Sequence, residues 1–198
     1  MRRFLMATLK ELTDRFPFEG RVEAIYLRPA REVAVVSVQR ANALAGRGLE
    51  GDRSAQGPAG RTMTHHKRQV TLFQAEHLPL LASWLGRPSL DARVLRRNIV
   101  ISGFNLLSAK ALFADQALRL RIGVAVSLRA SGPCDPCSKM EVALGPGTYN
   151  AMRGHGGLTA TVEVGGEIAV GDRVWVESVP AKAAPTIDAE DDGGAAPA

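Results

Sequence analysis

The sequence has only two cysteines among 198 residues, few aromatic side chains and no long apolar run. Two cysteines cannot build the disulfide framework of a small secreted domain. No stretch approaches the roughly 20 apolar residues that a membrane-spanning helix needs, so we expect no membrane association. Aromatic residues make up 5% of the chain, too few to form a stacking surface for nucleic acid. Nucleic acid is therefore not an expected partner.

The residues that are present describe a globular domain with a basic body. Apolar residues make up 45% of the chain, and the mean hydropathy is −0.03. The net charge of +5 is unevenly spread. Residues 180–198 contain one lysine and four acidic residues, a net charge of −3, which leaves +8 on residues 1–179. An anionic ligand or solubility alone would explain a basic body of this kind.

Composition divides the chain into three parts. Residues 1–19 have apolar side chains at spacings of three to four, which predicts an N-terminal helix. Its apolar stretch is short and is interrupted at Lys10, so it does not fit a signal peptide, and we expect a cytoplasmic protein. Residues 20–179 form the main domain, and residues 180–198 are predicted to be a disordered tail rich in alanine and acidic residues.

Short β-rich runs dominate the main domain and do not alternate regularly with helices. This pattern predicts a mainly β fold, an antiparallel barrel-like domain with a few short inserted helices, rather than a parallel βαβ sheet. One strand is expected to begin at Gly20. The other expected strands cover residues 33–38, 68–73, 98–102, 118–122, 124–130, 158–164 and 173–177. Expected helices cover residues 74–85, 136–144 and 148–152.

The two cysteines, Cys134 and Cys137, form a C-x-x-C pair with four possible interpretations. The pair is a redox dithiol, half of a zinc site completed by histidines such as His65, His66 and His155, a single reactive thiolate, or two small buried apolar residues. The thiolate interpretation favours Cys137, because a helix start and Lys139 would both stabilise negative charge there.

Two glycine-rich loops, at residues 46–52 and 152–157, lie beside basic side chains. Neither has the spacing of a phosphate-binding P-loop or opens a dinucleotide-binding helix. Their backbone N–H groups can line an anion site next to Arg47, Arg53 and Arg153. Ordinary tight turns explain the same glycines.

Taken in chain order, six segments resemble the MOSC domain, the C-terminal domain of molybdenum cofactor sulfurases, which also occurs as stand-alone bacterial proteins. The resemblance covers roughly residues 20–178. The six segments are G-L-E-G-D (48–52), R-Q-V-T-L (68–72), R-R-N-I-V-I-S-G (96–103), P-C (136–137), M-R-G-H-G-G (152–157) and G-G-E-I-A-V-G-D (165–172).

The resemblance implies a β-barrel fold and binding of the molybdenum cofactor, a molybdopterin with a terminal phosphate. Cys137 matches the family's hallmark cysteine, which ligates molybdenum in relatives that hold the metal, and Cys134 matches an extra cysteine found in some members. The implied catalytic residues are therefore Cys137 and Cys134. The implied cofactor-binding residues are Gly51, Asp52, Arg97, Asn98, Lys139 and Arg153.

Three functions follow as expectations. The first is a molybdenum-dependent oxidoreductase that reduces N-hydroxylated small molecules at a metal held by Cys137. The chain has no flavin, haem or iron–sulfur motif, so electrons would come from a partner protein. The second is a sulfur carrier, with a persulfide on Cys137 supplied by a cysteine desulfurase and released through Cys134. The third is a non-enzymatic anion-binding module with structural thiols.

Overall fold

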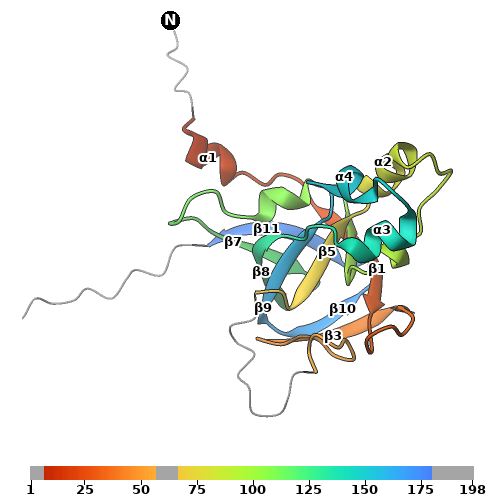
Figure 1. Ribbon diagram of the computed structural model, residues 1–198. Coiled ribbons are helices and arrows are strands. Elements are labelled where there is room, and N and C mark those ends of the chain that lie inside the picture. Colours follow the sequence, from red (N-terminus) through yellow and green to blue (C-terminus); the bar gives the residue numbers. More distant parts are fainter. Residues whose placement is uncertain (1–6, 57–66, 180–198) are drawn as a thin grey trace, which may run out of the picture.

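The computed structural model describes residues 7–56 and 67–179, and its centre is a closed β-barrel of seven strands (Figure 1). The barrel closes where the last strand pairs with the first, at Gly20 with Val174 and Arg21 with Arg173. In spatial order the strands are β1 (Gly20–Leu27), β6 (Ile99–Ser102), β5 (Val70–Gln74), β9 (Leu158–Val164), β8 (Val126–Pro133), β7 (Ala117–Ile122) and β11 (Arg173–Val179). The predicted mainly β, barrel-like fold is confirmed.

Two smaller β elements extend the barrel. Strand β2 (Val36–Val38) pairs antiparallel with residues 25–27 at the C-terminal end of β1. A separate sheet lies along one side of the barrel, below it in the view of Figure 1, and has the order β10 (Gly166–Ala169), β3 (Arg40–Leu44), β4 (Gly48–Leu49). These two elements place the loop after β4 next to the end of β1, where it contributes to the site described below.

One strand pair departs from the antiparallel pattern. Strands β5 and β6 are parallel, and the connection between them contains helix α2 (His77–Trp84) and the 3-10 helix η2 (Ala92–Leu95). A parallel pair needs a crossover of this kind, because its strands enter the sheet from the same end. The chain therefore contains one βαβ unit, although the sheet as a whole is not parallel.

The barrel interior is filled by alternating apolar side chains. In β7, Leu118, Leu120 and Ile122 are buried, whereas the residues between them are partly exposed. The same alternation brings aliphatic side chains from all seven strands into one core cluster. Truncating one of them, as in Leu120→Ala, would cost about 2–5 kcal/mol of stability.

Three short helices, α2, α3 (Ser138–Leu144) and α4 (Thr148–Met152), gather over one end of the barrel (Figure 1). Their apolar side chains form a second buried cluster with η2 and the end of β5, made of Phe73, Leu81, Leu95, Met140, Leu144 and Met152. This cluster fixes residues 134–137, here called the cysteine segment, against the barrel. Within residues 7–56 and 67–179, no helix is long and apolar enough to span a membrane.

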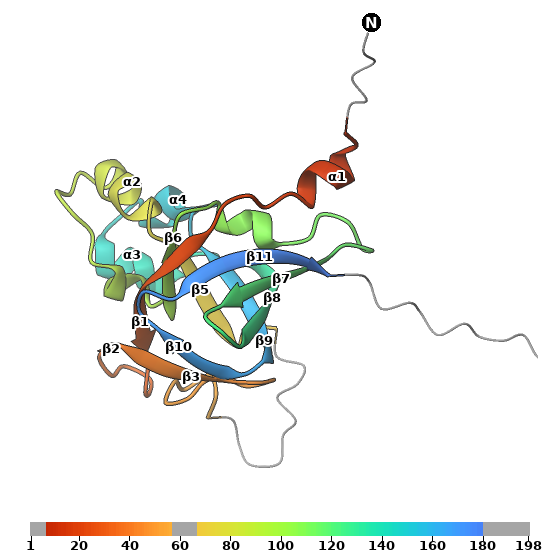
Figure 2. The same ribbon diagram turned by 180° about the vertical axis from the view of Figure 1, so that it is seen from behind.

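The N-terminal helix is shorter than predicted. Among the described residues, α1 covers only Leu9–Thr13 and stands away from the barrel (Figure 2). It begins at a capping box in which Thr8 and Glu11 bond each other's backbone N–H groups. Pro17 opposes helical geometry at the residue before it, which helps explain why the helix stops early. Residues 1–6 and the predicted tail 180–198 lie outside the described residues.

Several further boundaries differ from the predictions, and the two described next differ most or lie nearest the cysteines. The strand expected at 33–38 is reduced to β2, and the helix expected at 136–144 begins only at Ser138. Cys137 is its N-cap residue, with extended backbone angles φ −133° and ψ 170°. The predicted position of Cys137 in the first helical turn is therefore wrong, although the residue does border the helix start.

Candidate functional site

A basic cavity of about 680 Å³ opens beside the start of α3. Seven cationic side chains line it, and no aspartate or glutamate is among the described residues on its wall. They come from the end of β1, the loop after β4, the start of β5, the end of η2 and the start of α3. The seven are Arg28, Arg31, Arg53, Arg68, Arg96, Arg97 and Lys139. A wall with one sign of charge is an anion-binding arrangement.

The cations of this wall fall into two groups. Arg28, Arg68 and Arg97 make hydrogen bonds within the protein. The other four side chains have no hydrogen-bond or ion-pair partner among the described residues, and they are Arg31, Arg53, Arg96 and Lys139. The first group supports the wall, and the second is available to a ligand.

A buried polar network lies behind the wall and is centred on Asp52. The Asp52 carboxylate accepts hydrogen bonds from Arg28 Nε at 3.0 Å, Arg28 Nη2 at 3.1 Å and Asn98 Nδ2 at 2.8 Å. Ser54 also donates to it through its backbone N–H and its hydroxyl. The network connects the end of β1 to the loop after β4 and to the start of β6.

The pKa of Asp52 reflects two opposing effects. Burial raises it, but the hydrogen bonds and charge of Arg28 and the hydrogen bonds from Ser54 outweigh burial and hold the pKa at about 2. Asp52 is therefore ionised at neutral pH and balances the buried charge of Arg28.

Asn98 has no free hydrogen-bonding capacity. Its Oδ1 accepts from Arg28 Nη2, from Thr71 N and from the Thr71 hydroxyl, and its Nδ2 donates to Asp52 and to the carbonyl of Tyr26. Asn98 is completely buried, as is Asp52, and neither lines the cavity. Both residues, predicted as cofactor contacts, hold Arg28 in place from behind the wall.

Arg97 joins three segments that lie far apart in the sequence. Its guanidinium donates to the carbonyls of Gly156 at 2.8 Å, Leu95 at 3.0 Å, Cys134 at 3.0 Å and Asp135 at 3.3 Å. Burial lowers its pKa, and the nearby thiol groups act in the opposite direction. Arg97 thus fixes the cysteine segment while placing positive charge near both sulfur atoms.

The two cysteines occupy different environments. Cys134 is 1% exposed, and its Sγ lies 3.1 Å from Nη2 of Arg68. Cys137 is exposed and belongs to the wall of the basic cavity. Both are free thiols. The two sulfur atoms therefore differ in access, because one is enclosed beside a guanidinium and the other faces the cavity.

The glycines of the 152–157 loop allow it to pack against the cysteine segment. A Cβ on Gly156 would lie 2.2 Å from the carbonyl oxygen of Cys134, and Gly157 has a φ of +97°. The backbone N–H of Cys134 donates to the carbonyl of Gly157 at 2.9 Å. Arg153, from the same loop, is exposed and is not among the described residues that line the cavity.

The remaining predicted residues also divide into those that line the cavity and those that do not. Lys139 lines the cavity beside Cys137, whereas Gly51 does not line it and serves a tight turn with φ +78°. Of the histidines considered for zinc, His65 and His66 lie outside the described residues. No cluster of three or more metal-ligating side chains occurs within residues 7–56 and 67–179.

Sequence reasoning missed Arg28 and Arg68. Each lies at one end of a strand, where an arginine is ordinary, and the sequence does not tell which end faces a cavity. It also missed the contact of His77 with His155, whose ring centroids are 4.7 Å apart in a T-shaped arrangement. Burial lowers the pKa of His77, and the charge of His155 lowers it further.

Comparisons with known proteins agree with this architecture. YuaD from Bacillus subtilis superimposes with a TM-score of 0.67 at 19% identity, covering 83% of this chain and all of YuaD. YiiM from Geobacillus stearothermophilus has a TM-score of 0.56 at 19% identity, covering 79% of this chain and 74% of its own. YiiM from Escherichia coli has a TM-score of 0.54 at 19% identity, covering 80% of this chain and 69% of its own. At this identity the likeness concerns the fold.

No curated protein matches the sequence. The family model described as MOSC domain matches residues 59–175, which is more than half of the chain and includes both cysteines. The seven-stranded barrel, the ordered motifs and this match agree, and the chain belongs to the MOSC domain family.

Proposed function

We propose that the chain binds the molybdenum cofactor in the basic cavity and reduces N-hydroxylated small molecules there. The observation that carries the proposal is the wall itself, where seven cations and no acid among the described residues surround the exposed thiol of Cys137. MOSC domains are generally associated with this cofactor. A phosphate and a metal that accepts a thiolate are the two groups such a wall can hold.

The residues present fit the cofactor in charge and in donor type. The guanidinium groups of Arg31, Arg53 and Arg96 have no partner among the described residues and can donate paired hydrogen bonds to a phosphate. Cys137 offers a soft sulfur ligand of the kind that molybdenum accepts. A volume of about 680 Å³ lies within the ordinary range for cofactor pockets.

Each part of the site has its own task in this proposal. Arg31, Arg53 and Arg96 bind the phosphate, and Lys139 adds positive charge beside Cys137. The buried network of Asp52 keeps the wall rigid, so that little ordering is needed on binding. When bound, the cofactor supplies the oxygen-removal chemistry. The electrons come from a separate donor protein.

Metal and pterin analysis tests the proposal directly. The protein, produced in a host that makes the cofactor, should co-purify with molybdenum and with the fluorescent oxidation product of the pterin. Cys137→Ser should lose most of the molybdenum and keep part of the pterin, because the phosphate contacts remain. Cys134→Ser is the matched control and should keep both. Equal molybdenum in the wild type and Cys137→Ser would refute metal ligation by Cys137.

A second function rests on a different observation, the contact between Arg68 and the buried sulfur of Cys134. A sulfur carrier needs one exposed thiol to receive a sulfur atom and a second thiolate to release it. A persulfide on Cys137 would be attacked at its inner sulfur by the Cys134 thiolate. This attack forms the Cys134–Cys137 disulfide, breaks the sulfur–sulfur bond of the persulfide and releases hydrosulfide.

This second function predicts cyanide-labile sulfur after incubation with a cysteine desulfurase and cysteine. Cys137→Ser should abolish the labile sulfur. Cys134→Ser should retain it but lose hydrosulfide release in the absence of added thiol. A wild-type protein that never takes up labile sulfur would remove this function and leave the cofactor proposal untouched.

A further inference from the structure

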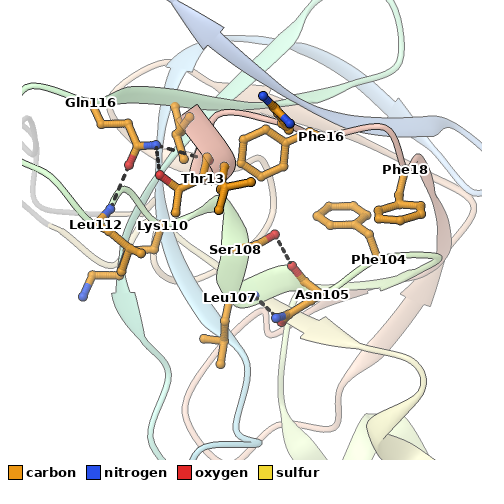
Figure 3. Close-up of a pocket in the computed structure, with 13 residues that line it drawn as sticks. Thr13, Phe16, Phe18, Phe104, Asn105, Leu107, Ser108, Lys110, Leu112 and Gln116 are labelled. Carbon is orange, nitrogen blue, oxygen red and sulfur yellow. Dashed lines mark hydrogen bonds between the residues drawn. The ribbon is translucent and has the colours of Figure 1, made fainter. Parts of the chain in front are cut away.

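A second pocket, of about 490 Å³, lies between the N-terminal segment and the loop that precedes β7. It shares no lining residue with the basic cavity. Its wall is mostly apolar and comes from two stretches, residues 12–18 and residues 104–118, which include the 3-10 helix η3 (Leu106–Ala109). Figure 3 shows the rings of Phe16, Phe18 and Phe104 around the same space.

The pocket is built by specific contacts. The side chain of Gln116 is buried, and its Nε2 donates to the carbonyl of Thr13 at 3.2 Å, the Thr13 hydroxyl at 3.1 Å and Asp14 Oδ1 at 2.8 Å. Its Oε1 accepts the backbone N–H of Leu112 at 2.9 Å (Figure 3). An ion pair between Lys10 and Asp115 adds a second link. Together these contacts hold the N-terminal segment against the loop that precedes β7.

Large apolar side chains remain exposed around the pocket. Leu12 is 52% exposed, Phe18 68% and Leu112 70%, and all three line it. Contiguous apolar surface of this kind on a folded protein marks a binding site more often than it serves packing. The concave shape and the volume favour a small molecule that inserts between the side chains.

The charges on this wall are also of one sign. Arg15 and Lys110 line the pocket, and no carboxylate is among the described residues that do so. Neither cation has a hydrogen-bonded side-chain partner among the described residues. Glu11, which attracts Arg15, is already occupied with the backbone of Thr8. Arg15 directly precedes Phe16 in the wall, so it is the main candidate to meet an anion bound beside the phenyl rings.

We infer that this pocket binds an apolar monocarboxylate, such as a medium-chain fatty acid. The chain of the ligand would lie among Phe16, Phe18 and Phe104, and its carboxylate would pair with Arg15. Burial of the alkyl chain provides most of the affinity, which therefore rises with chain length. The ion pair at the rim distinguishes an acid from a neutral molecule of the same length.

Calorimetric titration of the full chain with decanoate, below its micellar concentration, tests the inference. We expect saturable binding at one site, with decanol binding about tenfold more weakly. Arg15→Gln should weaken decanoate binding about tenfold and leave decanol unchanged. Arg40→Gln, a charge change on strand β3, is the matched control and should alter neither.

A second pair of variants tests the apolar wall. Leu112→Glu places a carboxylate on an exposed position of the wall and should nearly abolish decanoate binding, whereas Val124→Glu, at a fully exposed turn, should not. Equal affinity for decanoate and decanol would overturn the proposal. The proposal would also be overturned if the protein does not bind decanoate but partitions onto phosphatidylcholine–phosphatidylglycerol vesicles. It would be overturned as well if the protein does not bind decanoate but self-associates in a way that Leu112→Glu abolishes. The first result would identify a lipid surface as the occupant, and the second another copy of the chain.

Discussion

The two pockets of this molecule are built in opposite ways. The wall of the basic cavity collects charged side chains from five segments between residues 28 and 140, and a buried polar network supports it. The apolar pocket uses two segments, which the side chain of Gln116 and the ion pair of Lys10 with Asp115 join. The first therefore depends on closure of the whole barrel, whereas the second depends on a local contact. Each of the following changes should affect one pocket and spare the other.

The largest effect is expected for Asp52→Ala. Removing this carboxylate leaves the charge of Arg28 buried without a counter-ion, which typically costs about 3–5 kcal/mol. Urea denaturation should show this loss, and Glu50→Ala, at an exposed neighbouring position, should change stability by less than about 0.5 kcal/mol. A loss below about 1 kcal/mol for Asp52→Ala would mean that water replaces the carboxylate and that the network is not essential to the wall.

The next effect is a pH dependence. The pKa of Asp52 is about 2 in the folded protein and about 4 in the unfolded chain, so its ionised form favours folding. This contribution, about 2–3 kcal/mol, is fully present above pH 4 and is lost as the pH falls toward 2. The stability difference between the wild type and Asp52→Asn should therefore shrink over this interval. A difference independent of pH would contradict the assigned pKa.

A smaller effect is expected for Gln116→Ala. Loss of its hydrogen bonds should release the N-terminal segment at a cost of about 1–2 kcal/mol, without unfolding the barrel. Tryptic cleavage after Arg15 should become at least about tenfold faster, because a five-residue helix is unstable on its own. Pyrophosphate binding in the basic cavity should not change. Unchanged cleavage would show that the apolar contacts alone hold the segment.

The smallest effect concerns a single cation of the basic wall. Arg53→Gln should weaken the binding of inorganic pyrophosphate about threefold at low salt, and the difference should diminish at high salt. Arg40→Gln again serves as the control and should leave the affinity unchanged. Decanoate binding should be the same in both variants. A salt-independent loss in Arg53→Gln would indicate a structural change rather than the loss of a charge.

Some elements were predictable from the sequence, including their bounds. Strand β9 and helix α4 have the bounds that their patterns predicted, residues 158–164 and 148–152. Strand β3 was missed because its buried positions are Ala41 and Ala43, small residues with no β-branched signal. Strand β10 was missed for a related reason, since four residues beginning with glycine gain strand geometry only by pairing with β3.

Several residues that line the basic cavity were named from the sequence, but their arrangement was not predicted. Arg97, Cys137 and Lys139 were identified from local motifs, and all three reach the wall of the cavity. Asp52 and Asn98 came from motifs of the same kind yet lie behind the wall. A motif gives residue types and their spacing, and it does not tell whether a side chain lines a cavity or supports a neighbour that does.

The sequence alone determined the kind of protein this is. The alternating apolar runs predicted a barrel, the ordered motifs predicted the MOSC family, and residues 1–179 carry a basic excess of charge. Tertiary structure alone decided which cations face the cavity and which are bound within the protein, and it set Cys134 and Cys137 in different environments. The reason is that burial and charge pairing arise from segments far apart in the chain, which only barrel closure brings together.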